Sequence, residues 1–94
     1  MDSMFNSSGL TIIDVSSFDT SNVAAMTYMF YNSSVITIYA SNKFVTNNVE
    51  ESSNMFSAST NLVGGNGTRQ SASHTDKEYA RIDTANAPGY FTSK

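Results

Sequence analysis

The chain contains an internal repeat of 25 to 26 residues. Residues 4–28 are followed by a similar segment, residues 29–54, which carries one inserted residue. The opening Met-Phe pair then returns a third time at Met55. A unit of this length has too little core of its own, so successive copies must bury their apolar side chains against one another. The repeat therefore constrains the fold more than any other feature of the chain.

Apolar residues coincide when the two copies are aligned. The matched pairs are Leu10 with Val35, Ile13 with Ile38, Val15 with Ala40, Phe18 with Phe44, Val23 with Val49, and Met29 with Met55. Equivalent residues of adjacent strands lie about 4.8 Å apart, so we expect the first three pairs to form a continuous apolar column. The three Met-Phe pairs should form a second column, and such a stripe is more often core packing than a cofactor site.

Each copy combines two periodicities. Leu10, Ile13 and Val15 have the spacing of a leucine-rich repeat, whose later part is a short strand. Val23 and Met26 begin a pattern with helical intervals after a run of capping residues, and a second helix should begin near Val49. We therefore predict an α/β solenoid, a leucine-rich-repeat-like right-handed coil of short parallel strands and short helices.

The repeat pattern stops after Val63, where a glycine-rich run replaces the apolar strand. We predict one structural domain with about two and a half repeats in residues 1–63 and a C-terminal capping segment in residues 64–94. The cap should be small and β-rich, with short strands at residues 79–83 and 90–92. Met1 and its neighbours resemble the end of a copy, which suggests further repeats upstream in the same protein.

Composition narrows the possible functions. The 94 residues carry a net charge of −3 with only five Lys and Arg, which argues against nucleic-acid binding. Cysteine is absent, so disulfides and thiolate metal sites are excluded. No apolar run approaches the roughly 20 residues needed to cross a bilayer, and no signal peptide is evident.

The sequence contains no recognisable catalytic motif. His74 is the only histidine and lies in a polar stretch without the context of a hydrolase triad. The glycine-rich run 64–68 lacks the lysine of a phosphate-binding loop, and Asp14 and Asp19 are too few for a calcium site. We expect no enzymatic activity, no cofactor and no bound metal.

Several motifs together resemble one protein family. They are Met29-Phe30-Tyr31-Asn32, the run from Ser17 to Val23, and the closing segments at residues 62–68, 79–83 and 88–92. These are similar to the BspA-like leucine-rich repeat family of bacterial surface proteins, and the likeness covers nearly the whole chain. The resemblance implies a cell-surface or secreted array associated with adhesion to host or extracellular-matrix proteins.

The outward side of the predicted strands is the candidate binding face. Side chains alternate along a strand, so the outward positions are Ile12, Asp14, Ser16, Thr37, Tyr39 and Ser41. An exposed tyrosine gives a large contact area at low entropic cost, which makes Tyr39 the best single candidate. Two functions follow. The chain is either a non-catalytic, protein-binding or adhesive part of a surface protein, or a purely structural terminal cap or spacer with no ligand of its own.

Overall fold

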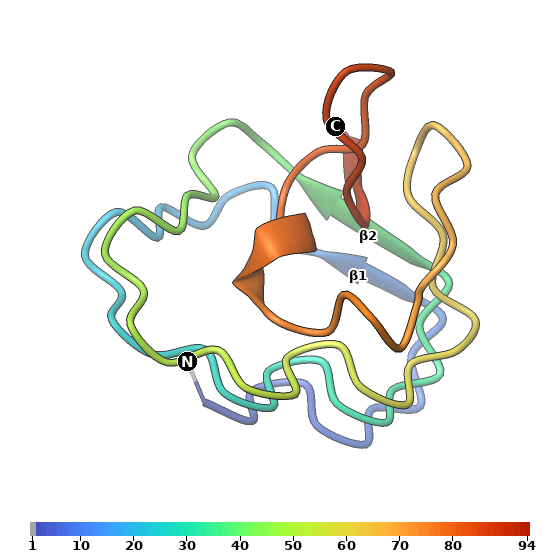
Figure 1. Ribbon diagram of the computed structural model, residues 1–94, viewed down its shortest axis with the longest axis horizontal. Helices are drawn as coiled ribbons and strands as arrows, with labels where there is room; N and C mark the ends of the chain where they lie inside the picture. Colours follow the sequence, from blue (N-terminus) through green and yellow to red (C-terminus); the bar gives the residue numbers. More distant parts are fainter. Residues whose placement is uncertain (1) are drawn as a thin grey trace.

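Three short parallel strands form one open sheet in the computed structural model, which describes residues 2–94 (Figure 1). β1 (Ile12–Asp14) lies at one edge, β2 (Thr37–Ala40) in the middle and β3 (Phe91–Ser93) at the other edge. A single 3-10 turn, η1 (Lys77–Tyr79), is the one helical element within residues 2–94. The molecule measures 28 × 27 × 24 Å.

β1 and β2 pair at a separation of one repeat. Ile13 aligns with Ile38 and Asp14 with Tyr39, and both isoleucines are buried. The predicted alignment of Ile13 with Ile38 is therefore confirmed. The other neighbour of β2 is β3, in which Phe91 aligns with Ile38, so this strand comes from the C-terminal segment and not from the third copy.

The third copy leaves the sheet at Val63. The backbone N–H of Val63 still donates to the carbonyl oxygen of Ile36 at 2.9 Å. At the next residue, Gly64, a Cβ atom would lie 2.3 Å from the carbonyl oxygen of Gly89. Only glycine allows two backbones to approach this closely, because it has no Cβ atom. The glycine-rich run therefore lets the chain turn away from the sheet, and β3 pairs with β2 in place of the third copy.

The segments predicted to be helical are turns whose backbone hydrogen bonds run between copies. The N–H of Phe5 donates to the carbonyl oxygen of Met29, and that of Phe30 donates to Met55, both at 2.8 Å. Pairs of left-handed backbone conformations recur around the start of each copy, at Ser3 (φ 57°) and Ser7 (57°), Tyr28 (57°) and Asn32 (50°), and Asn54 (56°) and Ala58 (62°). Such residues interrupt an α-helix, so the prediction of short helices, including one beginning near Val49, is wrong.

The phenylalanine side chains of the three copies stack into a column. Phe5 and Phe30 have ring centroids 5.4 Å apart at an interplanar angle of 6°, and Phe30 and Phe56 are 5.4 Å apart at 3°. Phe91 of β3 meets Phe30 and Phe56 edge to face, with centroids 6.1 Å from each. Met29 and Met55 are fully buried beside these rings. Strand β3 and the aromatic column therefore close the core together.

The fold class predicted from the sequence is wrong. Residues 2–94 form a small, compact, β-rich structure around an open parallel sheet, without an α-helix and without the predicted α/β solenoid or leucine-rich-repeat-like right-handed coil. The predicted pairing of Leu10 with Val35 in a buried column also fails. Leu10 is 56% exposed whereas Val35 is fully buried. Within residues 2–94 the first copy has a neighbouring copy on one side, whereas the second copy has one on each side.

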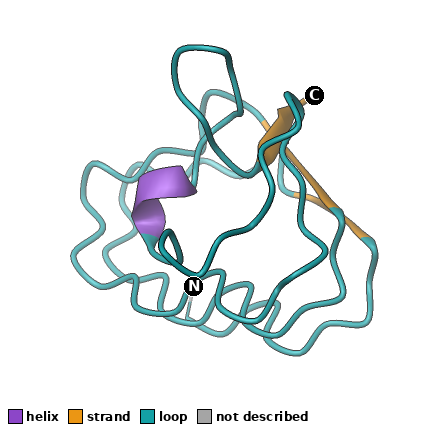
Figure 2. Cartoon of the chain, turned by 45° about the vertical axis from the view of Figure 1, so that its right-hand side comes forward, coloured by secondary structure: helices purple, strands orange, loops and turns teal. Residues whose placement is uncertain are grey.

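Residues 64–94 pack across the third copy, and Figure 2 shows that most of the chain outside the strands consists of loops and turns. Tyr90 is fully buried, and its hydroxyl donates to the carbonyl oxygen of His74 at 2.7 Å and accepts from the N–H of Ser71 at 3.0 Å. The predicted strand at residues 79–83 is reduced to one parallel bridge between Ile82 and Phe91. The division into residues 1–63 and a capping segment stays a prediction.

The buried carboxylate of Asp83 organises the loops of this C-terminal segment. It accepts hydrogen bonds from the N–H groups of Asn66 (2.9 Å), Thr68 (3.0 Å) and Gly89 (3.2 Å), and from the Thr68 hydroxyl (2.7 Å). Burial alone would raise the pKa of Asp83, but these hydrogen bonds outweigh burial and lower the pKa below its ordinary value. The ionised carboxylate therefore links its own loop to residues that lie 15 to 17 positions earlier in the chain.

Candidate functional site

The outward face of the sheet carries most of the predicted binding residues. In β1 the central Ile13 is buried while Ile12 and Asp14 are exposed, and in β2 the half-buried Thr37 and Tyr39 alternate with the buried Ile38 and Ala40. The strands thus alternate in the way that a sheet with one covered face requires.

The strand register places these side chains side by side. Ile12 lies opposite Thr37, and Asp14 lies opposite Tyr39. On the other side of Tyr39 the register adds Thr92 of β3, which sequence reasoning missed. The run at residues 90–92 was recognised as strand-forming, but nothing local to it indicated that it would pair with β2.

Ser16 and Ser41 lie outside the strands and serve the turns that follow them. The N–H of Ser16 donates to the Asp14 carboxylate at 2.9 Å, and the hydroxyl of Ser41 accepts from the N–H of Lys43 at 3.2 Å. Both serines are half-buried. Short polar side chains commonly satisfy turn backbone groups in this way. These two residues are therefore the least available of the six predicted positions.

Lys94 crosses this face of the sheet. Its Nζ lies 2.5 Å from Oδ2 of Asp14 and 5.3 Å from the centroid of the Tyr39 ring. The hydrogen bond with Lys94, together with those from Ser16, holds the pKa of Asp14 well below its usual range, and the same contact raises the pKa of Lys94. Both side chains remain about half exposed, so the pair contributes little to stability. Its effect is to cover part of Tyr39.

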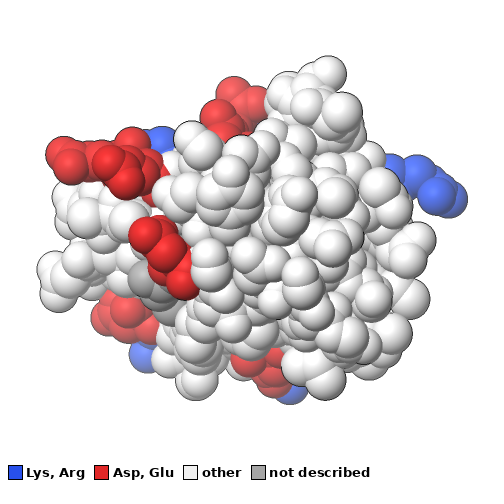
Figure 3. Space-filling model, turned by 90° about the horizontal axis from the view of Figure 1, so that it is seen from below, with Lys and Arg blue, Asp and Glu red and all other residues white. Residues whose placement is uncertain are grey.

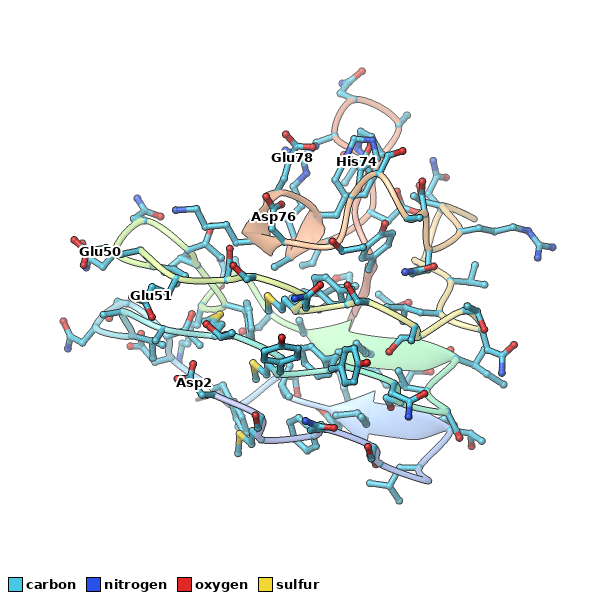
Figure 4. All side chains as sticks on the ribbon, turned by 60° about the horizontal axis from the view of Figure 1, so that its bottom comes forward. Asp2, Glu50, Glu51, His74, Asp76 and Glu78 are labelled. Carbon is cyan, nitrogen blue, oxygen red and sulfur yellow. The ribbon has the colours of Figure 1, made fainter. Side chains whose placement is uncertain are left out.

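A second polar cluster lies around η1. The Nδ1 atom of His74 is 2.8 Å from Oε1 of Glu78, and Figure 4 labels both residues. The imidazole stacks on the Tyr79 ring with centroids 4.2 Å apart. The guanidinium of Arg81 lies 5.6 Å from the same Tyr79 ring. Sequence reasoning found no carboxylate partner for His74, although the four-residue spacing to Glu78 was a usable signal. Within the described contacts the imidazole has Glu78 as its one hydrogen-bond partner, and an exposed pair of this kind is usually structural.

Charged side chains are sparse and dispersed on the surface. Seen from below, acidic groups lie mainly along one side and most of the face is uncharged (Figure 3). Asp2, Glu50 and Glu51 lie toward one side, away from His74 (Figure 4). Within residues 2–94 no three His, Asp or Glu side chains come together as a metal site would require, and no pocket is present. The same residues contain no helix with the length and apolar character of a membrane span.

Comparison with known proteins gives one match. A family described as "Mycoplasma protein of unknown function, DUF285" matches residues 1–86. No curated protein and no solved structure matches the chain. The predicted resemblance to the BspA-like leucine-rich repeat family is therefore wrong as stated, because the matching family is a different one and the match indicates neither leucine-rich repeats nor adhesion.

Proposed function

This chain belongs to the family described as Mycoplasma protein of unknown function, DUF285, and because that description assigns no activity, we propose a function from the surface of the chain itself. We propose that it is a non-catalytic module that binds a protein partner through the outward face of its sheet. The partner class to examine first is host or extracellular-matrix protein, which also implies a cell-surface or secreted location.

What supports the proposal is the composition of this face. Ile12 is 58% exposed and lies opposite Thr37. Tyr39 lies two residues after Thr37 in β2, on the same face of the sheet and opposite Asp14. An apolar side chain and an aromatic ring on a hydrogen-bonded framework lose little conformational entropy when a partner docks. The Asp14 and Lys94 pair beside Tyr39 adds a charged rim that can form hydrogen bonds to a partner.

A direct binding experiment tests this function. The chain would be immobilised and exposed to a panel of purified extracellular-matrix proteins, with binding measured by surface plasmon resonance. Tyr39→Ala should weaken binding by about tenfold or more, as loss of a central aromatic contact does. Tyr28→Ala is the matched control, because Tyr28 is also an exposed tyrosine but lies outside the strands. Equal affinities of the wild type and Tyr39→Ala would remove this face as the binding site.

A structural role is the second candidate function, and one observation favours it. Lys94 is already placed over Tyr39 and bonded to Asp14, so the chain itself occupies part of the face that a partner would need. In this alternative the chain is a terminal cap or spacer with no ligand of its own. Lys94→Ala separates the two, because uncovering Tyr39 should change the affinity for a real partner and should have no binding consequence for a spacer.

A further inference from the structure

The hairpin turn in the glycine-rich run contains an asparagine that is followed directly by a glycine. Among the ten asparagines of the chain, only Asn66 precedes a glycine. The N–H of Gly64 donates to the carbonyl oxygen of Thr68 at 2.8 Å, and the N–H of Gly67 donates to that of Gly64 at 3.0 Å. Gly67 has a φ of 93°, as expected of the glycine that ends a short hairpin loop with a bulge. The geometry of the turn therefore favours glycine directly after Asn66.

The tip of this turn is accessible to water. Asn66 and Gly67 are both exposed, and no heavy atom lies within 4 Å of the position that a Cβ atom of Gly67 would occupy. Among the hydrogen bonds of residues 2–94, Asn66 takes part through its backbone N–H and not through its side-chain amide. One backbone hydrogen bond, from Gly67 to Gly64, holds the nitrogen atom that follows Asn66. An exposed loop tip held in this way opens locally at low cost in free energy.

Asparagines in the repeat have more restricted neighbours. Asn32 precedes Ser33, which is 5% exposed and whose N–H donates to the hydroxyl of Ser59 at 3.1 Å. Asn54 precedes Met55, which is fully buried. In both places the following nitrogen is held by packing and is hindered by a side chain on its own residue. The backbone nitrogen that follows Asn66 has neither restriction, so it can approach the side-chain amide of Asn66 once the turn opens.

We propose that Asn66 is a site of spontaneous deamidation through a cyclic imide. The backbone nitrogen of Gly67 forms a bond to Cγ of Asn66 and gives its proton to solvent, while the side-chain amide nitrogen takes up a proton and leaves as ammonia. Water then opens the imide at one of its two carbonyl carbons. Opening at the side-chain carbonyl gives aspartate, whereas opening at the main-chain carbonyl gives isoaspartate, in which the main chain runs through the former side chain. The net reaction consumes one water molecule, releases one ammonia molecule and needs no oxidant or enzyme.

Isoaspartate at this position disrupts the contacts of the Asp83 carboxylate. Oδ2 of Asp83 accepts hydrogen bonds from the N–H groups of Asn66 at 2.9 Å and Thr68 at 3.0 Å. Isoaspartate inserts one carbon atom into the main chain between these two donors, so they no longer fit the same oxygen atom. Either product also adds a second carboxylate to the loop that binds Asp83, and like charges repel. The modification therefore weakens the attachment of residues 66–68 to the rest of the C-terminal segment.

Peptide mapping by mass spectrometry tests the site. The folded chain would be incubated in mildly alkaline buffer, and each asparagine would be followed by the mass change from an amide to a carboxyl group. Asn66 should convert faster than any other asparagine by about tenfold or more, because glycine leaves the attacking nitrogen unhindered. Asn66→Gln is the matched control. It keeps an amide at the exposed position but requires a larger ring, so conversion there should fall to the level of the other asparagines.

A chain unfolded in guanidinium chloride provides the reference rate. Conversion of Asn66 in the unfolded chain, with none in the folded chain over the same period, would overturn the proposal, because the turn would then protect Asn66 from the reaction. Faster conversion of any other asparagine in the folded chain would overturn it as well.

Thermal melting tests the structural consequence of the modification. The converted wild-type chain should melt about 4 °C or more below the fresh chain, because the buried Asp83 carboxylate loses hydrogen-bond donors in a small domain. Asn66→Gln incubated in the same way should keep its starting melting temperature. A converted wild-type chain with an unchanged melting temperature would show that Asp83 keeps its contacts, and would overturn the inferred effect on the C-terminal segment.

Discussion

The first and second copies of the repeat have similar sequences but very different surroundings. Met4 is 50% exposed and Met29 is fully buried, and Phe5 is stacked on one neighbouring ring whereas Phe30 lies between two. The second copy has the first copy on one side and the third copy with the C-terminal segment on the other. Equivalent residues therefore differ in burial because their copies differ in the number of neighbours, and residue type alone does not decide which apolar positions form the core.

Removing the C-terminal segment should abolish most of the difference in burial between the first and second copies. A chain truncated after Val63 lacks β3 and Phe91, so β2 loses a strand partner and Phe30 and Phe56 lose a shared aromatic contact. We expect no cooperative thermal transition by circular dichroism. A chain lacking only Lys94 is the control and should melt close to the intact chain. A truncated chain with an unchanged transition would contradict both this prediction and the capping role of residues 64–94.

Matched methionine substitutions measure the difference between the copies directly. Met29→Ala should lower the free energy of unfolding by about 2–5 kcal/mol, because it leaves a cavity in the core. Met4→Ala removes a half-exposed side chain and should cost within about 0.5 kcal/mol. Urea denaturation at a protein concentration where the chain is monomeric would give both values. Equal costs would mean that the first copy is as well covered as the second.

The carboxylate of Asp83 offers a pH test of the segment that covers the second and third copies. Asp83→Asn should cost about 1–3 kcal/mol at neutral pH, because the amide cannot accept all the hydrogen bonds of the carboxylate. The pKa of Asp83 is lower in the folded chain, so its stabilisation is present above the unfolded pKa and is lost as pH falls through the folded pKa. Thermal melts from neutral pH to below pH ~4 should show a smaller acid-induced loss in the variant. Parallel pH curves for the two proteins would exclude this role.

The smallest effect on stability is expected for the contact between Asp14 of β1 and Lys94, the residue after β3. Lys94→Ala removes the ion pair with Asp14 and the cation over Tyr39, both at the surface. We expect a melting temperature unchanged within error. The NMR signals of the Tyr39 ring should shift, because its local environment changes. Unshifted ring signals would show that Lys94 does not lie over Tyr39 in solution.

Pairing between the two full copies could be predicted from the sequence. Ile13 and Ile38 occupy equivalent positions, and the structure places them in register. The Met-Phe pattern likewise predicted the column in which Phe30 lies between Phe5 and Phe56. These predictions depend on comparing one copy with the other, and the repeat makes that comparison possible without any other information.

Other features depend on information that the repeat does not contain. The left-handed conformation of Tyr28 excludes the expected helix, yet tyrosine is not a residue that marks such a position. β3 pairs with a strand far upstream, and Asp14 bonds to Lys94 from the opposite end of the sequence. The alternation within each copy predicts the strand positions of Ile12, Asp14, Thr37 and Tyr39, and a binding role for this face stays a prediction. The partial cover of the face by Lys94 and its extension to Thr92 depend on this distant pairing.

The long separation between β2 and β3 also affects when the protein can fold. Ile38 is synthesised 53 residues before its partner Phe91, and these strands must be parallel neighbours. Until Phe91 has left the ribosome, the growing chain can pair β1 with β2 but leaves one side of β2 and the rings of Phe30 and Phe56 uncovered. Completion of the core therefore waits for the end of translation of this segment, and the nascent chain passes through an interval in which it is prone to aggregation and open to chaperones.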